Sequence, residues 1–185
     1  MRKMKHEVKD IIKRYDAGEK LEYVFFWGHH GKNGQVTKAC FSQWFPCNFE
    51  VDGIMYNCAE QYMMAEKARV FEDEETRAKI LAISDPKIIK ALGREVKNFT
   101  VEKWTPISKE IVVKGNMHKF AQNIELFQFL HGTGKKILVE ASPYDTIWGI
   151  GLGREDALKG GVEQWQGENL LGCALMDVRD WLKES

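Results

Sequence analysis

The most informative stretch of the sequence covers residues 57–68 and reads Asn57-Cys58-Ala59-Glu60-Gln61-Tyr62-Met63-Met64-Ala65-Glu66-Lys67-Ala68. We predict that it forms a short helix. Seven residues at about 100° each return almost to the starting direction, so Glu60 and Lys67 lie on one face, two turns apart. Met63 and Met64 fill the same stripe between them. An acid and an amine on an apolar face indicate a functional site, because burying charge is costly unless the charge is paired or used.

Ordinary structural roles are open for both charged residues. Asn57 is a preferred N-cap residue, and it would place Glu60 at the third helical position, where a capping-box carboxylate belongs. Lys67 could lay its aliphatic stem on the core and keep its amine in water. A second segment also places acidic residues directly beside an apolar run, and it favours the functional interpretation.

That second segment covers residues 136–153. The short β-branched run from Ile137 to Val139 predicts a buried strand, and it ends directly on Glu140. A Ser-Pro turn then carries Asp145, and Trp148 precedes a run of alternating glycines. Acids, an indole and a bare backbone at a strand end are the layout of a pocket wall, because glycines let the main chain approach a ligand closely. The alternative is an ordinary strand–loop connection with solvated acids.

The composition bounds the fold and the partners. With 185 residues, 44% hydrophobic and 29% charged, we expect one soluble domain over 1–185, with an N-terminal amphipathic helix within 1–20 and a core over 21–183. The apolar residues of that first helix follow helical spacing: Met4, Val8, Ile11, Ile12 and Tyr15. The net charge is +0, so no overall field draws the chain to DNA or to an anionic membrane. Any contact with nucleic acid must be local.

Cysteine, histidine and hydropathy patterns point to a cytoplasmic, metal-free protein. Cys40, Cys47, Cys58 and Cys173 form no Cys-x-x-Cys pair and resemble reduced thiols. The five histidines show no zinc-type spacing. We therefore expect no metal and no cofactor. Neither a secretory signal nor a membrane-spanning run is visible, so we expect no contact with a membrane.

The order of elements predicts an α+β, helix-rich fold with a few short strands. A buried strand is expected at 23–27, and Asp52-Gly53 predicts a β-hairpin between 49–51 and 54–56. Asp85 and Pro86 predict the capped start of a helix that Gly93 ends. The other expected helices cover 60–71, 73–83, 106–130 and 171–182. The glycine run does not fit a dinucleotide-binding or P-loop motif.

Several segments together resemble the YbiA-like, or NADAR (NAD- and ADP-ribose-associated), N-glycosidase family. They cover roughly residues 23–182, and their order along the chain carries the resemblance. The matching segments are 41–44, 56–68, Leu92-Gly93-Arg94, 119–123, 138–151 and 165–179. One departure is that members often carry Phe-Ser-Asn-Phe where this chain has Phe41-Ser42-Gln43-Trp44. A longer amide and a larger ring there would reshape the pocket.

The resemblance implies the YbiA-like fold and cleavage of the bond between a ribose C1 and a nitrogen. It associates two substrate classes with the chain. One is ADP-ribose on guanine in DNA or RNA, and the other is the ribosylated aminopyrimidines of riboflavin synthesis. We expect the first, with a nucleotide or ADP-ribosyl group as partner and no obligate protein partner. A non-catalytic ADP-ribose reader is a further alternative.

Breaking a C–N glycosidic bond builds positive charge on the sugar and negative charge on the departing nitrogen, so carboxylates and a proton donor are needed. Either a carboxylate orients water, or a lysine attacks C1 and forms a Schiff base after the sugar ring opens. We assign Lys67 as nucleophile, as the resemblance also implies, and Glu60 as its proton shuttle or charge partner. Asp145 would position the sugar or the base, and Glu140 a ribose hydroxyl or the loop.

Seven further residues are candidates for substrate binding. Two indoles would stack on a base, two guanidiniums would hold phosphate, and two glycines with an asparagine would line the diphosphate or ribose. Each has a structural alternative: core packing for the indoles, solvated helix positions for the arginines and a helix cap for the asparagine. These candidates are Trp148, Trp44, Arg69, Arg94, Gly149, Gly151 and Asn169.

Overall fold

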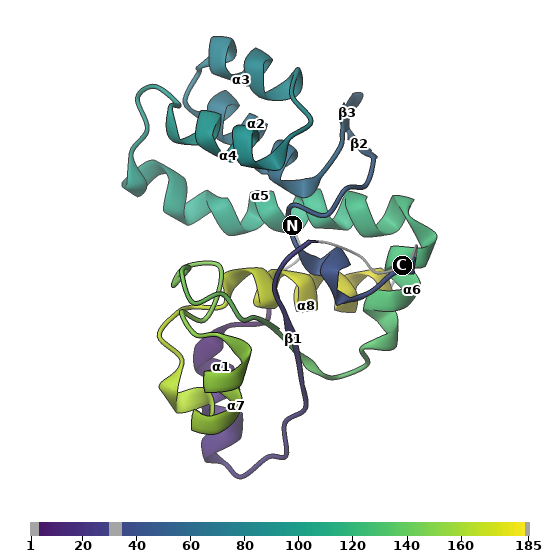
Figure 1. Cartoon of the computed structure of the whole chain (residues 1–185), viewed down its shortest axis with the longest axis vertical. Helices are drawn as coiled ribbons and strands as arrows, with labels where there is room; N and C mark the ends of the chain where they lie inside the picture. Colours follow the sequence, from purple (N-terminus) through teal and green to yellow (C-terminus); the bar gives the residue numbers. More distant parts are fainter. Residues whose placement is uncertain (1–3, 30–34, 184–185) are drawn as a thin grey trace. The chain divides into compact units, whose positions relative to one another are not determined.

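The computed structural model describes residues 4–29 and 35–183 and divides them into two compact units. Unit 1 combines the described residues up to 42 with those from 125 onward, and unit 2 covers 43–124. The predicted single domain over 1–185 stays a prediction, and its residues 1–3, 30–34 and 184–185 lie outside the described part. The helix-rich α+β class is confirmed (Figure 1).

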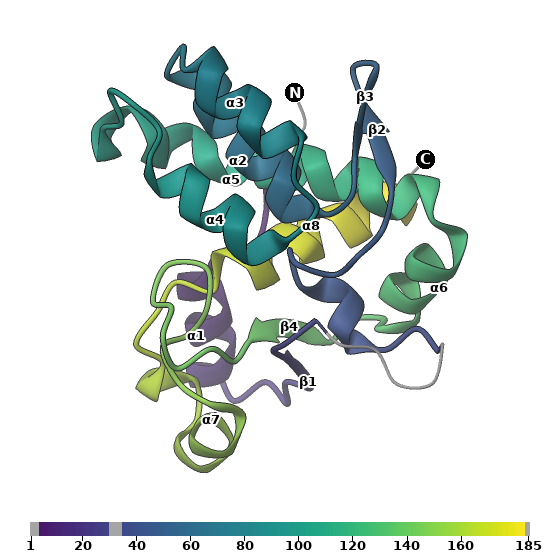
Figure 2. The ribbon, with the colours of Figure 1, turned by 45° about the horizontal axis from the view of Figure 1, so that its top comes forward.

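Unit 1 is built on two parallel strands, β1 (Tyr23–Phe26) and β4 (Ile137–Glu140). They pair in register from Tyr23 opposite Ile137 to Phe26 opposite Glu140. The helix α8 (Leu170–Lys183) packs on β4, which explains why the apolar run before Glu140 is buried (Figure 2). The remaining elements of this unit are α1 (Val8–Asp16), the 3₁₀ turn η1 (Lys38–Phe41), most of α6 (Ile124–Gly132), α7 (Arg154–Gly160) and the 3₁₀ turn η2 (Val162–Gln164).

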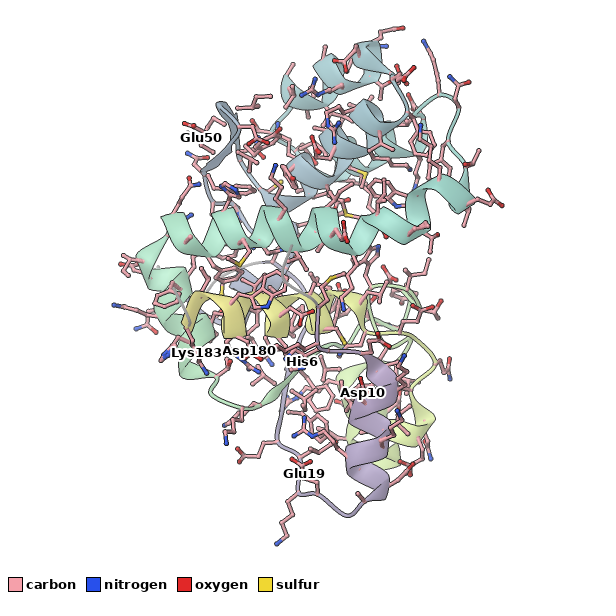
Figure 3. The ribbon with its side chains drawn as sticks, turned by 180° about the vertical axis from the view of Figure 1, so that it is seen from behind. His6, Asp10, Glu19, Glu50, Asp180 and Lys183 are labelled. Atoms are coloured by element: carbon pink, nitrogen blue, oxygen red, sulfur yellow. The ribbon has the colours of Figure 1, made fainter. Side chains whose placement is uncertain are left out.

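The segment before α1 is fixed to α8 by carboxylates of that helix. The buried Asp177 accepts hydrogen bonds from the backbone N–H groups of Lys5 and His6, at 2.7 and 3.3 Å. The Nε2 atom of His6 lies 2.9 Å from Oδ2 of Asp180, and Figure 3 shows both side chains. Because these contacts hold residues 5 and 6 outside a helix, α1 begins at Val8 and is shorter than the predicted segment.

Unit 2 contains a hairpin and four helices. The hairpin strands are β2 (Phe49–Val51) and β3 (Ile54–Tyr56), and they are antiparallel as predicted. Asp52 and Gly53 have φ values of 51° and 82°, the positive φ at both central positions that a two-residue I′ turn requires. The helices are α2 (Ala59–Val70), α3 (Glu74–Leu81), α4 (Pro86–Arg94) and α5 (Val101–Gln122) (Figure 1).

The predicted start of α4 is confirmed, and its predicted end is not. The Asp85 carboxylate accepts from the N–H groups of Lys87 and Ile88, and Pro86 occupies the first turn. Gly93 was expected to end the helix, but it lies inside α4 and is buried. A Cβ at this position would collide with the side chain of Met64 on α2. The glycine therefore allows two helices to approach closely.

The single helix predicted over 106–130 is wrong, because the chain forms α5 and α6 with a break at Asn123. Asn123 has φ −124° and ψ 92°, outside the helical region. Its side-chain amide donates to the carbonyls of Lys119 and Asn48, at 2.8 and 3.1 Å. The Asn123 amide thus satisfies a carbonyl at the end of α5 and one from a segment that is distant in sequence. Residue spacing along the chain cannot reveal such a contact. Helix α5 also begins earlier than predicted, at the Thr100 cap, and contains Pro106.

Helix α2 is the centre of unit 2, because it packs on α3, α4 and α5. The ring of Tyr62 lies so close to Gly115 on α5 that an added Cβ would come within 2.9 Å of its Cε1 atom. Buried residues occur all around α2, so it presents two different faces to its neighbours. None of the helices in residues 4–29 and 35–183 is long and apolar enough to cross a bilayer.

Candidate functional site

The predicted site residues fall into two sets, one in each unit. The set in unit 2 is Trp44, Glu60, Lys67, Arg69 and Arg94, and the set in unit 1 is Glu140, Asp145, Trp148, Gly149, Gly151 and Asn169.

Asn57 does not cap α2, contrary to the structural alternative considered for Glu60. Cys58 occupies the N-cap position and makes no side-chain cap. The N–H of Asn57 instead donates to Oε1 of Gln61 at 2.8 Å, and its side-chain amide reaches the carbonyl of Ile83 at 3.3 Å. Because Asn57 lies outside the cap position, the capping-box explanation of Glu60 is wrong.

The start of α2 is held by Gln43, a role that the sequence did not reveal. The N–H of Glu60 donates to the backbone carbonyl of Gln43 at 2.8 Å. The side-chain oxygen of Gln43 accepts from Nδ2 of Asn116 on α5 at 2.9 Å, and both side chains are buried. The residue that departs from the usual family motif is therefore tied to α5 and positions Glu60, which is itself only 5% exposed.

Lys67 lies half-buried on the same stripe of α2. Its Nζ donates to the carbonyl of Gly93 at 2.6 Å and lies 4.0 Å from the ring centroid of Phe99. Burial lowers the pKa of the Lys67 amine, the Glu60 carboxylate raises it, and Arg94 lowers it, with a lower pKa as the net result. The Lys67 amine therefore loses its proton at a lower pH than it would in water.

Arg94 and Trp44 belong to this unit as well. Arg94 is exposed at the end of α4, and its effect on the pKa of Lys67 places its charge near that amine. Trp44 is half-buried, and Nζ of Lys90 lies 5.8 Å from its ring centroid. A ligand contact for either residue stays a prediction.

Arg69 is not brought together with Lys67. Two residues on a helix correspond to about 200°, which puts Arg69 on the opposite side of α2. Its guanidinium binds Glu66, with Nε–Oε1 and Nη2–Oε2 distances of 3.0 and 2.8 Å. It lines a hollow beside the hairpin. Arg69 therefore lies apart from Lys67 on α2, and its predicted contact with phosphate stays a prediction.

In unit 1, Asn169 anchors β4 and thereby positions Glu140. Its Oδ1 accepts from the N–H of Glu140 at 3.0 Å, and its Nδ2 donates to the carbonyl of Leu138 at 2.9 Å. Asn169 is 0% exposed and has φ 51°. Both side-chain contacts are made to β4, and a ligand contact for Asn169 stays a prediction. It is a positioning residue for the half-buried Glu140.

Asp145 organises the loop after β4. Its Oδ1 accepts from the N–H groups of Ile147 and Trp148, at 2.9 and 2.8 Å. Such a carboxylate fixes a turn by bonding its own backbone two and three residues on. Asp145 and Trp148 are both half-buried, and the roles predicted for them and for Glu140 at the sugar and the base stay predictions.

The glycines of this loop serve backbone packing. A Cβ on Gly149 would lie 2.9 Å from the carbonyl oxygen of Glu140, and Gly151 has φ 67°. The carbonyl of Gly149 accepts from the N–H of Asn169 at 3.1 Å, and that of Ile150 from Gln166 at 2.9 Å. Gly149 is therefore explained by main chain lying on main chain and Gly151 by its positive φ, and a ligand contact for either glycine stays a prediction.

Two further residues shape the α2 site and were missed. The Gln61 side-chain nitrogen bonds the carbonyls of Ile80 and Ile83, at 3.1 and 2.9 Å, and so ties the start of α2 to the end of α3. A buried amide in an apolar helix was the available signal. Phe99, which lies under the Lys67 amine, is distant in sequence, and no local pattern indicated it.

Comparisons with known proteins agree with this fold and these motifs. A family model, the NADAR domain, matches residues 25–183. N-glycosidase R617 of Acanthamoeba polyphaga mimivirus is 46% identical over 165 residues, 86% of this chain and 95% of that protein. Riboflavin biosynthesis protein VVA0006 of Vibrio vulnificus is 31% identical, over 77% of this chain and 35% of that protein.

The NMR structure of the Escherichia coli protein YbiA matches with a TM-score of 0.71 and 26% identity, over 88% of this chain and 86% of that one. The chain belongs to the NADAR family. The predicted YbiA-like fold is thereby confirmed.

The described residues show neither a cluster of metal ligands nor a disulfide bond. Residues 4–29 and 35–183 hold no group of three or more His, Cys, Asp and Glu side chains arranged for a metal ion. The four cysteines are free thiols, and burial raises the pKa of Cys58 to about 11. Metal-independent catalysis stays a prediction.

Asn169→Ala is expected to destabilise the protein by roughly 3 kcal/mol or more, because two buried backbone groups lose their partners at about 1–3 kcal/mol each. The exposed Asn98 also has a positive φ, 58°, so Asn98→Ala is the matched control and should cost about 1 kcal/mol. Urea unfolding measures both. Equal losses in the two variants would show that Asn169 contributes only its backbone conformation.

Proposed function

We propose that this protein removes ADP-ribose from ADP-ribosylated guanine in nucleic acid, by hydrolysing the bond between ribose C1 and the base nitrogen. The similarity to N-glycosidases supports the broader class of activity. The chain is an N-glycosidase, a hydrolase acting on N-glycosyl bonds. The observation that carries the proposal is the buried Glu60 on the same stripe of α2 as Lys67, whose amine has a lowered pKa.

Lys67 is the proposed nucleophile. Its neutral amine attacks C1, the C1–N bond breaks, and the electron pair stays on the departing base nitrogen, which takes up a proton. The ring oxygen then leaves C1 with its bonding pair and takes up the second proton of Nζ, which gives an imine between Nζ and C1. Water adds to this imine and releases the sugar and the amine. The route needs a neutral lysine near pH 7, which partial burial against Phe99 promotes.

Glu60 is the proposed proton shuttle. Its carboxylate interacts electrostatically with the Lys67 amine, since it raises the pKa of that group. A buried acid next to an amine can accept the proton that Nζ loses and deliver it to the leaving nitrogen. The carbonyl of Gln43 fixes the backbone of this acid, so its distance to the amine is set by the helix.

Arg94 favours a substrate that carries phosphate. Its exposed guanidinium acts on the Lys67 amine, and guanidiniums bind phosphate oxygens in a bidentate manner. This fits a diphosphate such as that of ADP-ribose, and a phosphorylated ribose on an aminopyrimidine would also fit.

The second candidate function is hydrolysis of ribosylated aminopyrimidines of riboflavin synthesis. The observation in its favour is the name of the Vibrio relative. That name describes a protein of which the matched region covers 35%, so it weighs less than the mimivirus relative, which is matched over 95% of its length. A pure ADP-ribose reader is favoured least, because binding alone needs no amine with a lowered pKa.

The deciding experiment offers the protein ADP-ribosylguanosine in single-stranded DNA and, separately, a ribosyl-phosphate aminopyrimidine. We expect free ADP-ribose and unmodified guanine from the first substrate at a kcat/KM at least about tenfold above the second. Chromatography of the products measures both, with and without chelator. A preference for the aminopyrimidine would establish the second candidate, and unchanged ADP-ribosyl DNA with tight binding would establish a reader.

Lys67→Ala is expected to lower kcat by about 10³-fold or more, because it removes the nucleophile. Borohydride added during turnover should reduce the imine and leave sugar on the wild-type chain, with mass spectrometry locating it on Lys67. Lys97→Ala is the matched control, since hydrogen bonding to Glu75 raises the pKa of the exposed Lys97. Full activity in a folded Lys67→Ala protein would reject this role, and wild-type turnover without trapping would favour direct attack by water.

Glu60→Gln is expected to shift the pH dependence of kcat/KM to lower pH. The rate rises with pH as Lys67 loses its proton, and the Glu60 carboxylate raises the pKa of that amine. Removing this charge therefore lowers the pKa and moves the rising limb down, while loss of the shuttle reduces kcat by about 10²-fold or more. Steady-state rates over the pH range test this. An unmoved or upward-shifted limb would contradict the coupling of the two groups.

A further inference from the structure

The face of α2 opposite Lys67 carries a second polar cluster. Tyr62, Glu66 and Arg69 are spaced four and three residues apart, so they share a stripe whose members lie about 100–180° around the helix from Glu60 and Lys67. Together with the hairpin β2–β3, α3 and α5 this stripe lines a hollow of about 220 Å³. All of these elements belong to unit 2.

Two buried donors face this hollow without a partner. Tyr62 and Arg77, on α3, both line it, and the Tyr62 hydroxyl and Nε of Arg77 are buried and have no hydrogen-bond partner within the described part of the chain. Tyr62 is only 2% exposed. Buried polar groups are nearly always hydrogen-bonded, because a buried donor left unpaired costs about 1–3 kcal/mol. Two such donors in one hollow indicate an acceptor that the chain itself does not supply.

The other charges of the hollow are already paired. Arg69 binds Glu66, and Nζ of Lys114 on α5 binds Oδ2 of Asp52 at 2.6 Å. Three cations and two carboxylates line the hollow, which leaves an excess of one positive charge.

The third cation is Arg77, whose salt-bridge partner is not among the residues that line the hollow. Its Nη1 is held by Glu74 at 3.0 Å, a carboxylate outside the hollow whose side chain is 66% exposed. The guanidinium also lies beside Tyr56: burial raises the pKa of that phenol, and the charge of Arg77 and a hydrogen bond between the two side chains oppose this rise. A cation with a buried, unused N–H attracts an oxyanion.

The Tyr62 hydroxyl is rigidly placed. The ring stands against Gly115, where a side chain would clash with it. It also meets the ring of Tyr56 edge-on, at 5.1 Å between centroids and 87° between planes. A donor that is fixed before a ligand arrives loses little entropy on binding.

We propose that this hollow is a second binding site, which takes a small molecule with one oxyanion, phosphate or carboxylate, between the Tyr62 hydroxyl and the Arg77 guanidinium. Its volume is far above the roughly 30 Å³ of one water and below the roughly 300–1,000 Å³ of drug-sized ligands. It therefore suits a free anion or a small phosphorylated or carboxylated metabolite. The site lies on the opposite face of α2 from the proposed nucleophile and does not depend on the proposed function.

The test is isothermal titration of the full chain with inorganic phosphate and, separately, with acetate. We expect saturable binding of one of the two anions, and its identity distinguishes a phosphoryl from a carboxylate ligand. Tyr62→Phe and Arg77→Gln should each weaken this binding by about tenfold or more, since hydrogen bonds to charged groups are the strong ones. Thermal unfolding shows that the variants are folded.

Two control variants test whether the anion binds in this hollow and nowhere else on the protein. Glu74→Gln removes the outside partner of Arg77 and should preserve or tighten binding. Lys67→Ala should bind with unchanged affinity, whatever its effect on turnover. Absence of saturable binding to both anions would overturn the proposal, since the hollow would then hold only water. Equal affinity in wild type and Tyr62→Phe, or loss of binding in Lys67→Ala, would also overturn it.

Discussion

The backbone hydrogen bond between the N–H of Glu60 and the carbonyl of Gln43 is the constraint on which unit 2 depends most directly. It fixes where α2 begins, and with it the rotation of every side chain along that helix. Gln43 is held in turn by Asn116 on α5. An error of one residue at this start would turn the helix by about 100° and move Lys67 and Tyr62 off the faces that they occupy.

The setting of Lys67 shows how opposing electrostatic effects can be combined at one amine. Burial and the charge of Arg94 favour the neutral form, while Glu60 favours the charged form. A fully buried lysine would be permanently neutral and poorly accessible, and an exposed one permanently charged. The half-buried position on the Phe99 ring lies between these limits, which suits a group that must lose and regain a proton in each cycle.

Local patterns predicted those elements whose determinants are local. Asp52-Gly53 gave the hairpin, and Asp85-Pro86 gave the start of α4, because turn and cap geometry depend on two to four neighbouring residues. The same reasoning failed at Asn57 and Asn123, whose amides bond to residues 26 and 75 positions away. Arg69 lies on the other side of α2 from Lys67, as a spacing of two residues requires.

The sequence by itself determined the helix-rich α+β class, the family, and the placement of Glu60 and Lys67 on one stripe, since these follow from short-range spacing and motif order. Only the tertiary structure decided that the Gln43 carbonyl holds the start of the helix of Glu60 and that Asn169 anchors β4. It also decided that Gly149 packs main chain on main chain. Each of these depends on hydrogen bonds or contacts between groups that come together only when the chain folds, and no periodicity along the chain records them.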